Sequence, residues 1–471
     1  MTARFTPEEL AAATGGRWTG TPPASVDGVS TDTRTLPAGS LFVALRGERF
    51  DGHAFLAEAA ARGAAAAVVD ERFAAAGGAA GAGPAARLVV PDTLLALGAV
   101  ARLHRGRFQL PVVGVTGSNG KTTTREMIAA ILATRGGVLK SEGNLNNEVG
   151  VPLTLLGLEA SHSAAVIEMG MSHRGEIARL AAIALPQVGV VTLAAPAHLE
   201  GLGTVDAVAD AKAELYQGLP PGGIAVANAD DARMLKRAQA SGRRMITFSA
   251  AKGRRGDVVV LEIASRSLAE GGQGDDGLRF VLGVGNRQLP VHIPGLLGAH
   301  NAANAAAAAA AAIALGCTDR EIARGLAAVR PVGRRLRLET LASGVTLLDD
   351  CYNANPASMA AALATLAGLA GPGRRAVAVL GDMLELGAFE TEAHRALGAE
   401  AARSGVSALA SFGPRSRVTA EAARAAGLEP FHTEDVDALV RWARATLAPG
   451  DVLLVKGSRG MKLERLVEAL R

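Results

Sequence analysis

A glycine-rich loop between a short apolar run and a helical pattern constrains the fold of this chain more than any other feature. Residues 114–124 read GVTGSNGKTTT, and a helical pattern begins near Glu126. The usual phosphate-binding formula, G-x-x-x-x-G-K-[ST], requires a glycine five residues before Gly120. Val115 occupies that position, so the loop departs from the usual formula.

The chemistry of this loop nevertheless favours a phosphate ligand. Glycines at such a corner let backbone N–H groups point at phosphate oxygens, beside a helix N-terminus whose dipole favours anions. Lys121 would reach the β- and γ-phosphates, and the Thr122 hydroxyl would bind Mg²⁺. The alternative is an ordinary glycine-rich turn before a helix. Strand, glycines, GKT and helix stand in the order that phosphate binding requires, so we expect ATP or GTP here.

Strand-like and helical runs alternate along most of the chain. Over residues 109–328 this alternation predicts a mostly parallel, doubly wound sheet that forms a central P-loop ATPase domain. A C-terminal, Rossmann-like α/β domain is expected over 329–471, and a smaller mixed α/β domain over 1–108. Residues 74–86 are expected to form a flexible surface loop, and the polar residues 265–277 an insertion.

Composition excludes several other classes of protein. Apolar residues make up 49% of the chain but aromatic residues only 3%, so the cores must be built from Ala, Val and Leu. The formal charge of +4 over 471 residues is too small to indicate the concentrated basic face that binds nucleic acid. We expect no signal peptide and no membrane insertion, because no apolar run approaches the roughly 20 residues of a membrane span. Cys317 and Cys351 provide no disulfide framework, which favours a reducing, cytoplasmic compartment.

The rarity of lysine draws attention to the few that are present. The chain has 49 basic residues, of which seven are lysines and 42 are arginines. A lysine can lose its proton and react, whereas an arginine cannot. Lys121, Lys212 and Lys456 are therefore candidates for function, although Lys212 taken alone would be an exposed lysine on a helix.

Several polar residues follow predicted strands, where open α/β sheets bind their ligands. Glu168 lies in an otherwise apolar stretch, so its charge needs a metal ion or a salt-bridge partner. His198 taken alone is more often a packed surface histidine. Asn301 and Asn304 lie one turn apart and could bind a base edge, or Asn301 could cap its helix. Residues 349–359, DDCYNANPASM, form a polar cluster denser than a turn requires.

Taken together, these motifs resemble the ATP-dependent Mur ligases of cell-wall synthesis, over nearly the full chain. TGSNGKTTT is similar to that family's own loop variant, G-x-x-G-K-T, which accounts for Val115. GNLNN, EMG, AHLE, the lysine of AKAE and GAHNAAN follow in the family's order. DDCYNANPASM, GDMLELG, NNEVGVPLTLL and the N-terminal VSTDTRTLPAGSLFVALRGERFDGHAF resemble the member that adds D-alanyl-D-alanine. The DNPR motif of the member that adds the third residue is absent.

The resemblance implies roles for individual residues. It implies that Lys121, Lys212 and His198 are catalytic, and that Thr33 and Arg34 bind the UDP end of the substrate. The implied ATP-binding residues are Thr116, Gly117, Ser118, Asn119, Gly120, Lys121, Thr122, Thr123, Asn144, Asn301, Asn304, Arg335 and Asp350. The implied Mg²⁺ ligands are Thr122, Glu168, His198 and Lys212. Two positions depart from the family pattern: Leu193 replaces a common asparagine, and Arg334 replaces a common glycine, so the ATP arginine is Arg335 or Arg334.

The implied reaction makes a peptide bond through an acyl phosphate, with ATP and two Mg²⁺ ions. Lys212 would be carbamylated by CO₂, which turns a cation into a carboxylate able to hold the second Mg²⁺. The base that accepts the amine proton could be Asp350, His394 or the substrate phosphate. We expect the third domain to bind the dipeptide and to close on ATP.

The expected substrates are UDP-N-acetylmuramoyl-tripeptide and D-alanyl-D-alanine, and the chain is expected to be a monomer that binds no nucleic acid. One alternative is a related ligase such as folylpolyglutamate synthetase, which lacks the uridine-binding signature of residues 25–55. A second alternative is a nucleotide switch or regulatory ATPase, which would hydrolyse ATP without an acceptor and would not need the cluster at 349–359.

Overall fold

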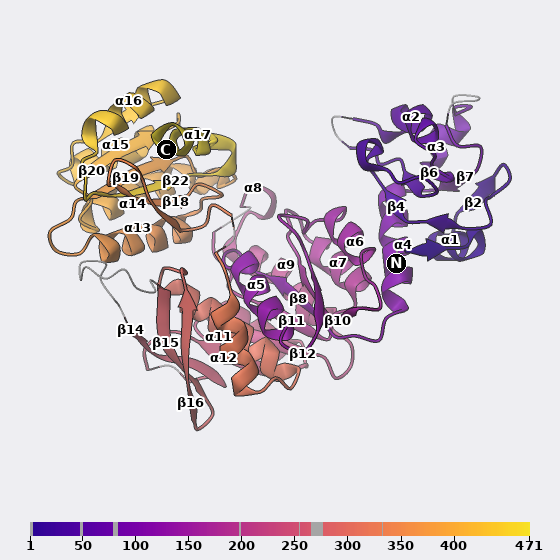
Figure 1. Cartoon of the computed structure of the whole chain (residues 1–471), viewed down its shortest axis with the longest axis horizontal. Helices are drawn as coiled ribbons and strands as arrows, with labels where there is room; N and C mark the ends of the chain where they lie inside the picture. Colours follow the sequence, from indigo (N-terminus) through magenta and orange to yellow (C-terminus); the bar gives the residue numbers. More distant parts are fainter. Residues whose placement is uncertain are drawn as a thin grey trace.

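Three α/β units follow one another along the chain. The structure, a computed structural model, describes residues 3–47, 50–78, 83–196, 199–253, 255–264, 277–331 and 333–471. Figure 1 shows the N-terminal unit in indigo at one end, the C-terminal unit in orange and yellow at the other, and the central unit between them. In the described part of the chain, no helix is both long enough and apolar enough to cross a membrane.

The N-terminal unit has a five-stranded sheet in the order β2-β7-β6-β5-β4. Only β2 runs antiparallel to its neighbour, and a separate antiparallel pair joins β1 to β3. The strands are β1 (Arg4–Phe5), β2 (Arg17–Thr19), β3 (Val26–Asp27), β4 (Val29–Ser30), β5 (Leu41–Val43), β6 (Ala66–Asp70) and β7 (Arg87–Val90). The helices are α1 (Pro7–Thr14), η1 (Thr33–Thr35), η2 (Gly52–Phe55), α2 (Leu56–Ala61), α3 (Glu71–Ala75) and α4 (Thr93–Gly106).

The central unit has a nine-stranded sheet in the order β16-β15-β14-β13-β12-β11-β8-β10-β9. The strands are β8 (Val112–Thr116), β9 (Gly137–Lys140), β10 (His162–Glu168), β11 (Val188–Val191), β12 (Ile224–Asn228), β13 (Arg244–Ser249), β14 (Val258–Ala264), β15 (Gly277–Val284) and β16 (Arg287–Pro294). The helices are α5 (Lys121–Leu132), α6 (Gly150–Leu155), α7 (Glu176–Ala184), α8 (Leu199–Leu202), α9 (Val205–Gln217), α10 (Ala232–Ala240), α11 (His300–Ala314) and α12 (Asp319–Ala328).

The predicted mostly parallel, doubly wound sheet is confirmed, with one addition. Strands β8 to β14 are parallel, with α5, α11 and α12 in the core on one face and α6, α7, α9 and α10 on the other. The sheet then continues antiparallel through β14, β15 and β16, which we did not predict. Of the expected insertion at 265–277, only Gly277 is described, and it begins β15; the rest lies outside the described residues.

The expected surface loop at 74–86 also differs from the structure. Ala74 and Ala75 end helix α3, so the loop begins later than the sequence indicated. Residues 79–82 lie outside the described residues.

The C-terminal unit has a six-stranded sheet in the order β17-β18-β22-β19-β20-β21, parallel except for β17. The strands are β17 (Arg337–Thr340), β18 (Thr346–Asp350), β19 (Ala376–Gly381), β20 (Ala408–Phe412), β21 (Phe431–Thr433) and β22 (Val452–Lys456). The helices are α13 (Pro356–Ala370), η3 (Gly387–Phe389), α14 (Glu390–Arg403), α15 (Arg417–Ala425), α16 (Val436–Thr446), η4 (Arg459–Met461) and α17 (Glu464–Leu470).

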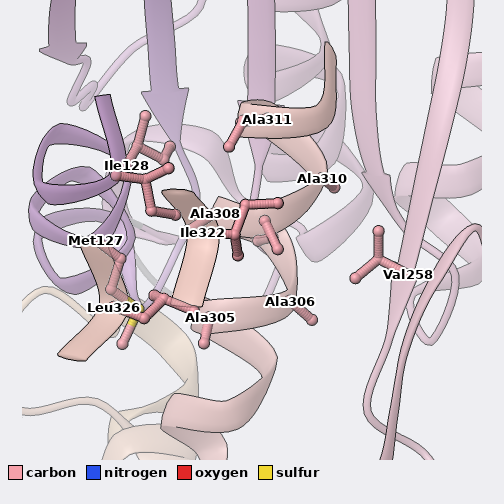
Figure 2. Close-up of a cluster of buried hydrophobic side chains, with 14 of the residues drawn as sticks. Met127, Ile128, Val258, Ala305, Ala306, Ala308, Ala310, Ala311, Ile322 and Leu326 are labelled. Atoms are coloured by element: carbon pink, nitrogen blue, oxygen red, sulfur yellow. The ribbon is translucent and has the colours of Figure 1, made fainter. Parts of the chain in front are cut away.

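Helix α11 shows how a chain poor in aromatic residues builds its core. Eight consecutive alanines, Ala305 to Ala312, are completely buried. Figure 2 shows several of them with Met127 and Ile128 of α5 and with Ile322 and Leu326 of α12. Because an alanine side chain is a single methyl group, the helix can be enclosed on all sides at short distance from its neighbours.

This tight packing predicts that α11 does not tolerate side chains larger than alanine at its buried positions. Ala308→Leu is expected to destabilise the chain by about 1–3 kcal/mol, because the added methylenes have no space. The matched control is Ala12→Leu in α1, where the alanine is exposed and a surface substitution should change little. Thermal unfolding of both variants measures the difference, and equal midpoints would show that the core around α11 can expand.

Candidate active site

The glycine-rich loop lies where the central sheet changes winding direction. Strand β8 is flanked by β10 and β11, and the loop leads from β8 into α5. Ligands of open α/β sheets bind beyond the carboxyl ends of the strands at such a point. Gly120, at the N-terminus of α5, has φ of 80°, a left-handed conformation that suits glycine.

Two glycines permit close packing of the loop. A Cβ atom on Gly117 would lie 1.8 Å from Oγ1 of Thr192, and one on Gly120 would lie 2.2 Å from Oδ1 of Asn304. The Ser118 hydroxyl donates to the backbone oxygen of Ala195 (3.0 Å). The loop is therefore packed closely against the segment after β11 and against helix α11.

The loop opens into a cleft of about 650 Å³ between the central and C-terminal units. Most of the candidate residues line it: Ser118, Asn119, Gly120, Lys121, Thr122, Thr123, Asn144, Glu168, Asn301, Asn304, Arg335 and Asp350. Thr116, Gly117 and Lys212 are not among the described residues that line the cleft, and Thr116 and Lys212 are buried. His198 lies outside the described residues.

Glu168 is buried and accepts hydrogen bonds through both of its carboxylate oxygens. Its Oε2 accepts from the Thr122 hydroxyl (3.0 Å) and from NH1 of Arg125 (3.0 Å), and its Oε1 accepts from Nδ2 of Asn146 (2.9 Å). The salt-bridge partner that the sequence left open is therefore Arg125, itself buried and also paired with Glu126. Arg125 and Asn146 were not predicted, although Arg125 lies three residues after Thr122, on the same side of α5.

Two of the lysines in the central unit, Lys121 and Lys212, have pKa values lowered by burial. Desolvation in the cleft lowers the pKa of Lys121, with the Glu168 carboxylate opposing the shift and the Arg335 charge adding to it. Its Nζ donates to the backbone oxygen of Gly117 (2.8 Å). Burial places the pKa of Lys212 well below its usual value, and the charge of Lys121 lowers it further. The Lys212 ammonium has no ion-pair partner among the residues that the structure describes.

Asn301 and Asn304 form a small amide network at the start of α11. Nδ2 of Asn304 donates to Oδ1 of Asn301 (2.8 Å), whose own Nδ2 donates to the backbone oxygen of Leu297 (2.6 Å). No side chain caps the N-terminus of α11, which begins at His300, so the capping alternative for Asn301 is wrong.

The structure separates the two arginine candidates of the third unit. Arg335 lines the cleft, and its guanidinium lies over the Tyr352 ring at 4.2 Å from the centroid. Arg334 instead pairs with Asp349 (3.3 Å) and Glu468 (2.7 Å). Arg335 is therefore the arginine positioned to meet a ligand of the cleft.

The two proposed proton acceptors are both engaged. His394 is fully buried; its Nε2 accepts from the backbone N–H of Met383 (3.1 Å) and its Nδ1 donates to the backbone oxygen of Glu390 (2.8 Å). It holds a loop in place and does not line the cleft. Asp350 lines the cleft but pairs with Nζ of Lys456 (2.7 Å).

Asn119 and Asn355 join the phosphate loop directly to the third unit. Nδ2 of Asn119 donates to Oδ1 of Asn355 (3.1 Å), and Nδ2 of Asn355 donates to Oδ1 of Asn119 (2.6 Å). Oδ1 of Asn355 also caps α13 by accepting from the backbone N–H of Ser358 (2.9 Å). The sequence marked both residues but gave no signal that they touch, because they are 236 positions apart.

The uridine candidates lie in the N-terminal unit, away from the cleft. Thr33 is buried in the short helix η1. Arg34 is exposed, and its NH2 pairs with Oδ2 of Asp32 (2.6 Å).

Comparison with known proteins places the chain in a family. Three family models match it: the Mur ligase family catalytic domain over 25–105, the Mur ligase middle domain over 115–312, and the Mur ligase glutamate ligase domain over 334–459. The UDP-N-acetylmuramoyl-tripeptide--D-alanyl-D-alanine ligase of Escherichia coli (strain K12) is 40% identical over 95% of this chain and 94% of its own. This chain belongs to the Mur ligase family.

Solved structures agree with this membership. MurF from Acinetobacter baumannii superposes with a TM-score of 0.88 and 34% identity, covering 100% of this chain and 99% of its own. The MurF ligase of Thermotoga maritima in complex with ADP has a TM-score of 0.82 and 28% identity, covering 94% and 96%. The three-domain α/β fold of this Mur ligase chain is thus the fold of these enzymes.

The amide pair between Asn119 and Asn355 predicts a measurable coupling between the two domains. Asn119→Ala and Asn355→Ser each remove the same contact, and serine retains an oxygen to cap α13. The two variants together should therefore destabilise the chain by less than the sum of the single effects, with a coupling of about 0.5–1.5 kcal/mol.

Thermal unfolding of the four proteins of this double-mutant cycle measures the coupling. The matched control pairs Asn119→Ala with Asn353→Ser, since Asn353 also lines the cleft but bonds to the backbone of Ala354. Additive effects of Asn119→Ala and Asn355→Ser would mean that the contact contributes nothing to joining the domains.

Proposed function

We propose that this chain is an ATP-dependent ligase that joins D-alanyl-D-alanine to UDP-N-acetylmuramoyl-tripeptide, giving UDP-N-acetylmuramoyl-pentapeptide, ADP and phosphate in the cytoplasm. Family membership and near full-length similarity to enzymes of that name support the proposal. The observation that carries it is that the glycine-rich loop and the strand-end cluster of the third unit line the same cleft. A nucleotide and an acceptor held on opposite walls can react with each other.

The reaction first activates a carboxylate. A carboxylate oxygen of the tripeptide attacks the γ-phosphorus of ATP, the bond from that phosphorus to the β-γ bridging oxygen breaks, and ADP leaves. The dipeptide amine then attacks the acyl carbon, and the tetrahedral intermediate loses phosphate while the nitrogen loses a proton. The first step brings two anions together, so neutralisation by Lys121 and Arg335 in the cleft is its main requirement.

Asp350 and the substrate phosphate are the candidates for accepting the amine proton. His394 is unsuitable, because both of its ring nitrogens are hydrogen-bonded to the backbone. The leaving phosphate is created beside the attacking nitrogen, so it can take the proton without a protein base.

The donor set of the cleft fits Mg²⁺. The described residues contain no cluster of three or more His, Cys, Asp or Glu side chains able to enclose a metal. Mg²⁺ needs no such enclosure, because it is commonly held by one or two carboxylates together with phosphate oxygens and water. Glu168 and the Thr122 hydroxyl lie together at the loop, and a carboxylate can accept from Arg125 and still bind a metal. When bound, Mg²⁺ would neutralise charge on the phosphates. We propose His198 and carbamylated Lys212 as the remaining ligands.

Lys212 has the environment that carbamylation requires. Only the neutral amine attacks CO₂, and burial of Lys212 favours the neutral form. The N–C bond to CO₂ forms as the nitrogen loses a proton, which leaves a carboxylate. The carbamate carries a negative charge that the nearby Lys121 cation would attract, whereas the ammonium form of Lys212 is repelled by Lys121.

The three units divide the substrates in this proposal. Domain 1–108 would bind the UDP end through Thr33 and Arg34, domain 109–328 would bind ATP, and domain 329–471 would bind the dipeptide. A related ligase such as folylpolyglutamate synthetase is disfavoured, because residues 25–105 match the Mur ligase family catalytic domain. A nucleotide switch is disfavoured because it would not need the polar cluster at 349–359, residues of which line the cleft together with the phosphate loop.

The proposal predicts strict coupling between ATP hydrolysis and peptide-bond formation. With the UDP-tripeptide present, ADP and pentapeptide should appear together only when D-alanyl-D-alanine is added, as followed by mass spectrometry. Lys121→Ala should reduce the rate about 10²–10³-fold, as the loss of one electrostatic donor does. Lys252→Ala, at an exposed position, is the matched control. ADP release that ignores both substrates would instead indicate a nucleotide switch.

Carbamylation of Lys212 predicts a covalent signal that does not depend on turnover. Protein equilibrated with ¹³C-bicarbonate should show one slowly exchanging carbamate resonance, because burial favours the neutral amine of Lys212 and shields it from solvent. Lys212→Met should lose this resonance and Lys252→Met should retain it. A spectrum that is identical for both variants would exclude Lys212 as the modified residue and leave the ligase assignment to the assay above.

A further inference from the structure

The carboxyl ends of three adjacent strands in the C-terminal unit meet at a change of winding direction. Strand β22 lies between β18 and β19. The helices that follow β18 and β19, α13 and α14, pack on one face of the sheet, whereas α17, which follows β22, packs on the other. The loops therefore diverge at this point, and the crevice between them is the part of the cleft that Tyr352, Asn353 and Arg459 line. Open α/β sheets bind ligands at such a point.

This crevice is built from loops that hold one another. Ser458 donates its backbone N–H to the backbone oxygen of Asp382 (3.0 Å), and its Oγ accepts from the backbone N–H of Leu384 (3.0 Å). Nζ of Lys456 donates to the backbone oxygen of Asn353 (2.8 Å) as well as to Asp350. The loops after β18, β19 and β22 thus form one connected wall, and Arg459 follows directly after Ser458.

Arg459 is the cation of this wall that is still available. Lys456 is paired with Asp350, and Arg335 is near enough to the phosphate loop for its charge to act on Lys121. Arg459 lines the cleft and is exposed, and no residue in the described part of the chain gives it a carboxylate partner. Its guanidinium lies over the Tyr352 ring, 5.6 Å from the centroid, so the side chain is oriented without being neutralised.

We propose that Arg459 binds the terminal carboxylate of the acceptor dipeptide at this crevice. The inference rests on the proposed function, which supplies an acceptor with one amine to react and one carboxylate to be held. An arginine binds a carboxylate through two parallel N–H···O bonds, which fixes the orientation of the acceptor as well as its position. With the carboxylate held at the third unit, the free amine is the end directed across the cleft toward the phosphate loop.

The arrangement around Tyr352 connects the two halves of the reaction. Arg335 and Arg459 both lie over this one ring, at 4.2 and 5.6 Å from its centroid. One guanidinium is positioned for the nucleotide and the other for the acceptor, so a single aromatic side chain sets the separation of the two substrates. Arg459 is thus a specificity residue, which selects acceptors with an anionic end.

The test compares D-alanyl-D-alanine with D-alanyl-D-alaninamide, which lacks the negative charge. The wild-type enzyme should show a KM for the amide about tenfold or more above that for the acid, as expected for hydrogen bonds to a charged group. Arg459→Gln should raise the KM for the acid by a similar factor and leave the KM for the amide almost unchanged. The KM for ATP should change less than about twofold, and Arg459→Lys should restore part of the preference.

The matched control is Arg465→Gln, at an exposed position of α17, which should retain the full preference for the acid. Equal losses for acid and amide in Arg459→Gln would overturn the inference, and so would a rise confined to the KM for ATP. Wild-type enzyme that makes no pentapeptide from the dipeptide would refute the proposed function itself. Dipeptide turnover that is unaffected by Arg459→Gln would refute only the role of Arg459.

Discussion

The close packing of the loop after β8 is the constraint on which the rest of the site depends. Gly117 and Gly120 leave no space for a Cβ atom against Thr192 and Asn304, so the loop is fixed between the segment after β11 and helix α11. Fixing the backbone before a ligand arrives lowers the ordering cost of binding. It also positions the Thr122 hydroxyl at Glu168 and the Asn119 side chain at Asn355 of the third unit.

Charge balance then determines what the cleft can accept. The buried Glu168 carboxylate forms an ion pair with Arg125, which offsets part of the cost of burying its charge. The charge of Arg335, by contrast, repels that of Lys121 and helps lower the pKa of Lys121, although the Glu168 carboxylate opposes this shift. A triphosphate bound between Lys121 and Arg335 would attract both cations. Nucleotide binding would therefore favour the approach of the third unit to the phosphate loop.

Short motifs and hydrophobic periodicity were enough to predict the local elements and the α/β class of each unit. The strand, loop and helix of residues 112–132 and the α/β classes of the three units follow from local pattern, and the structure agrees. The antiparallel strands β15 and β16 were missed although Gly285 and Asn286 form a two-residue turn between them, because the adjacent polar segment hid the pairing. Contacts between distant residues, such as Arg125 with Glu168 or Asn119 with Asn355, have no local signal. His394 shows the converse: its residue type suggested catalysis, but its backbone partners give it a structural role.

The position of the third unit has a further consequence for how this enzyme could discriminate between acceptors. The amide pair of Asn119 and Asn355 fixes one end of the loop after β18, while Lys456 holds Asn353 at its centre. Tyr352 lies in this same loop and carries both Arg335 and Arg459 over its ring. Any displacement of the third unit relative to the phosphate loop would therefore move Arg335 and Arg459 together. If the two arginines bind nucleotide and acceptor as proposed, both substrates depend on this one loop, and closure of the cleft on ATP would also set the geometry of the acceptor site.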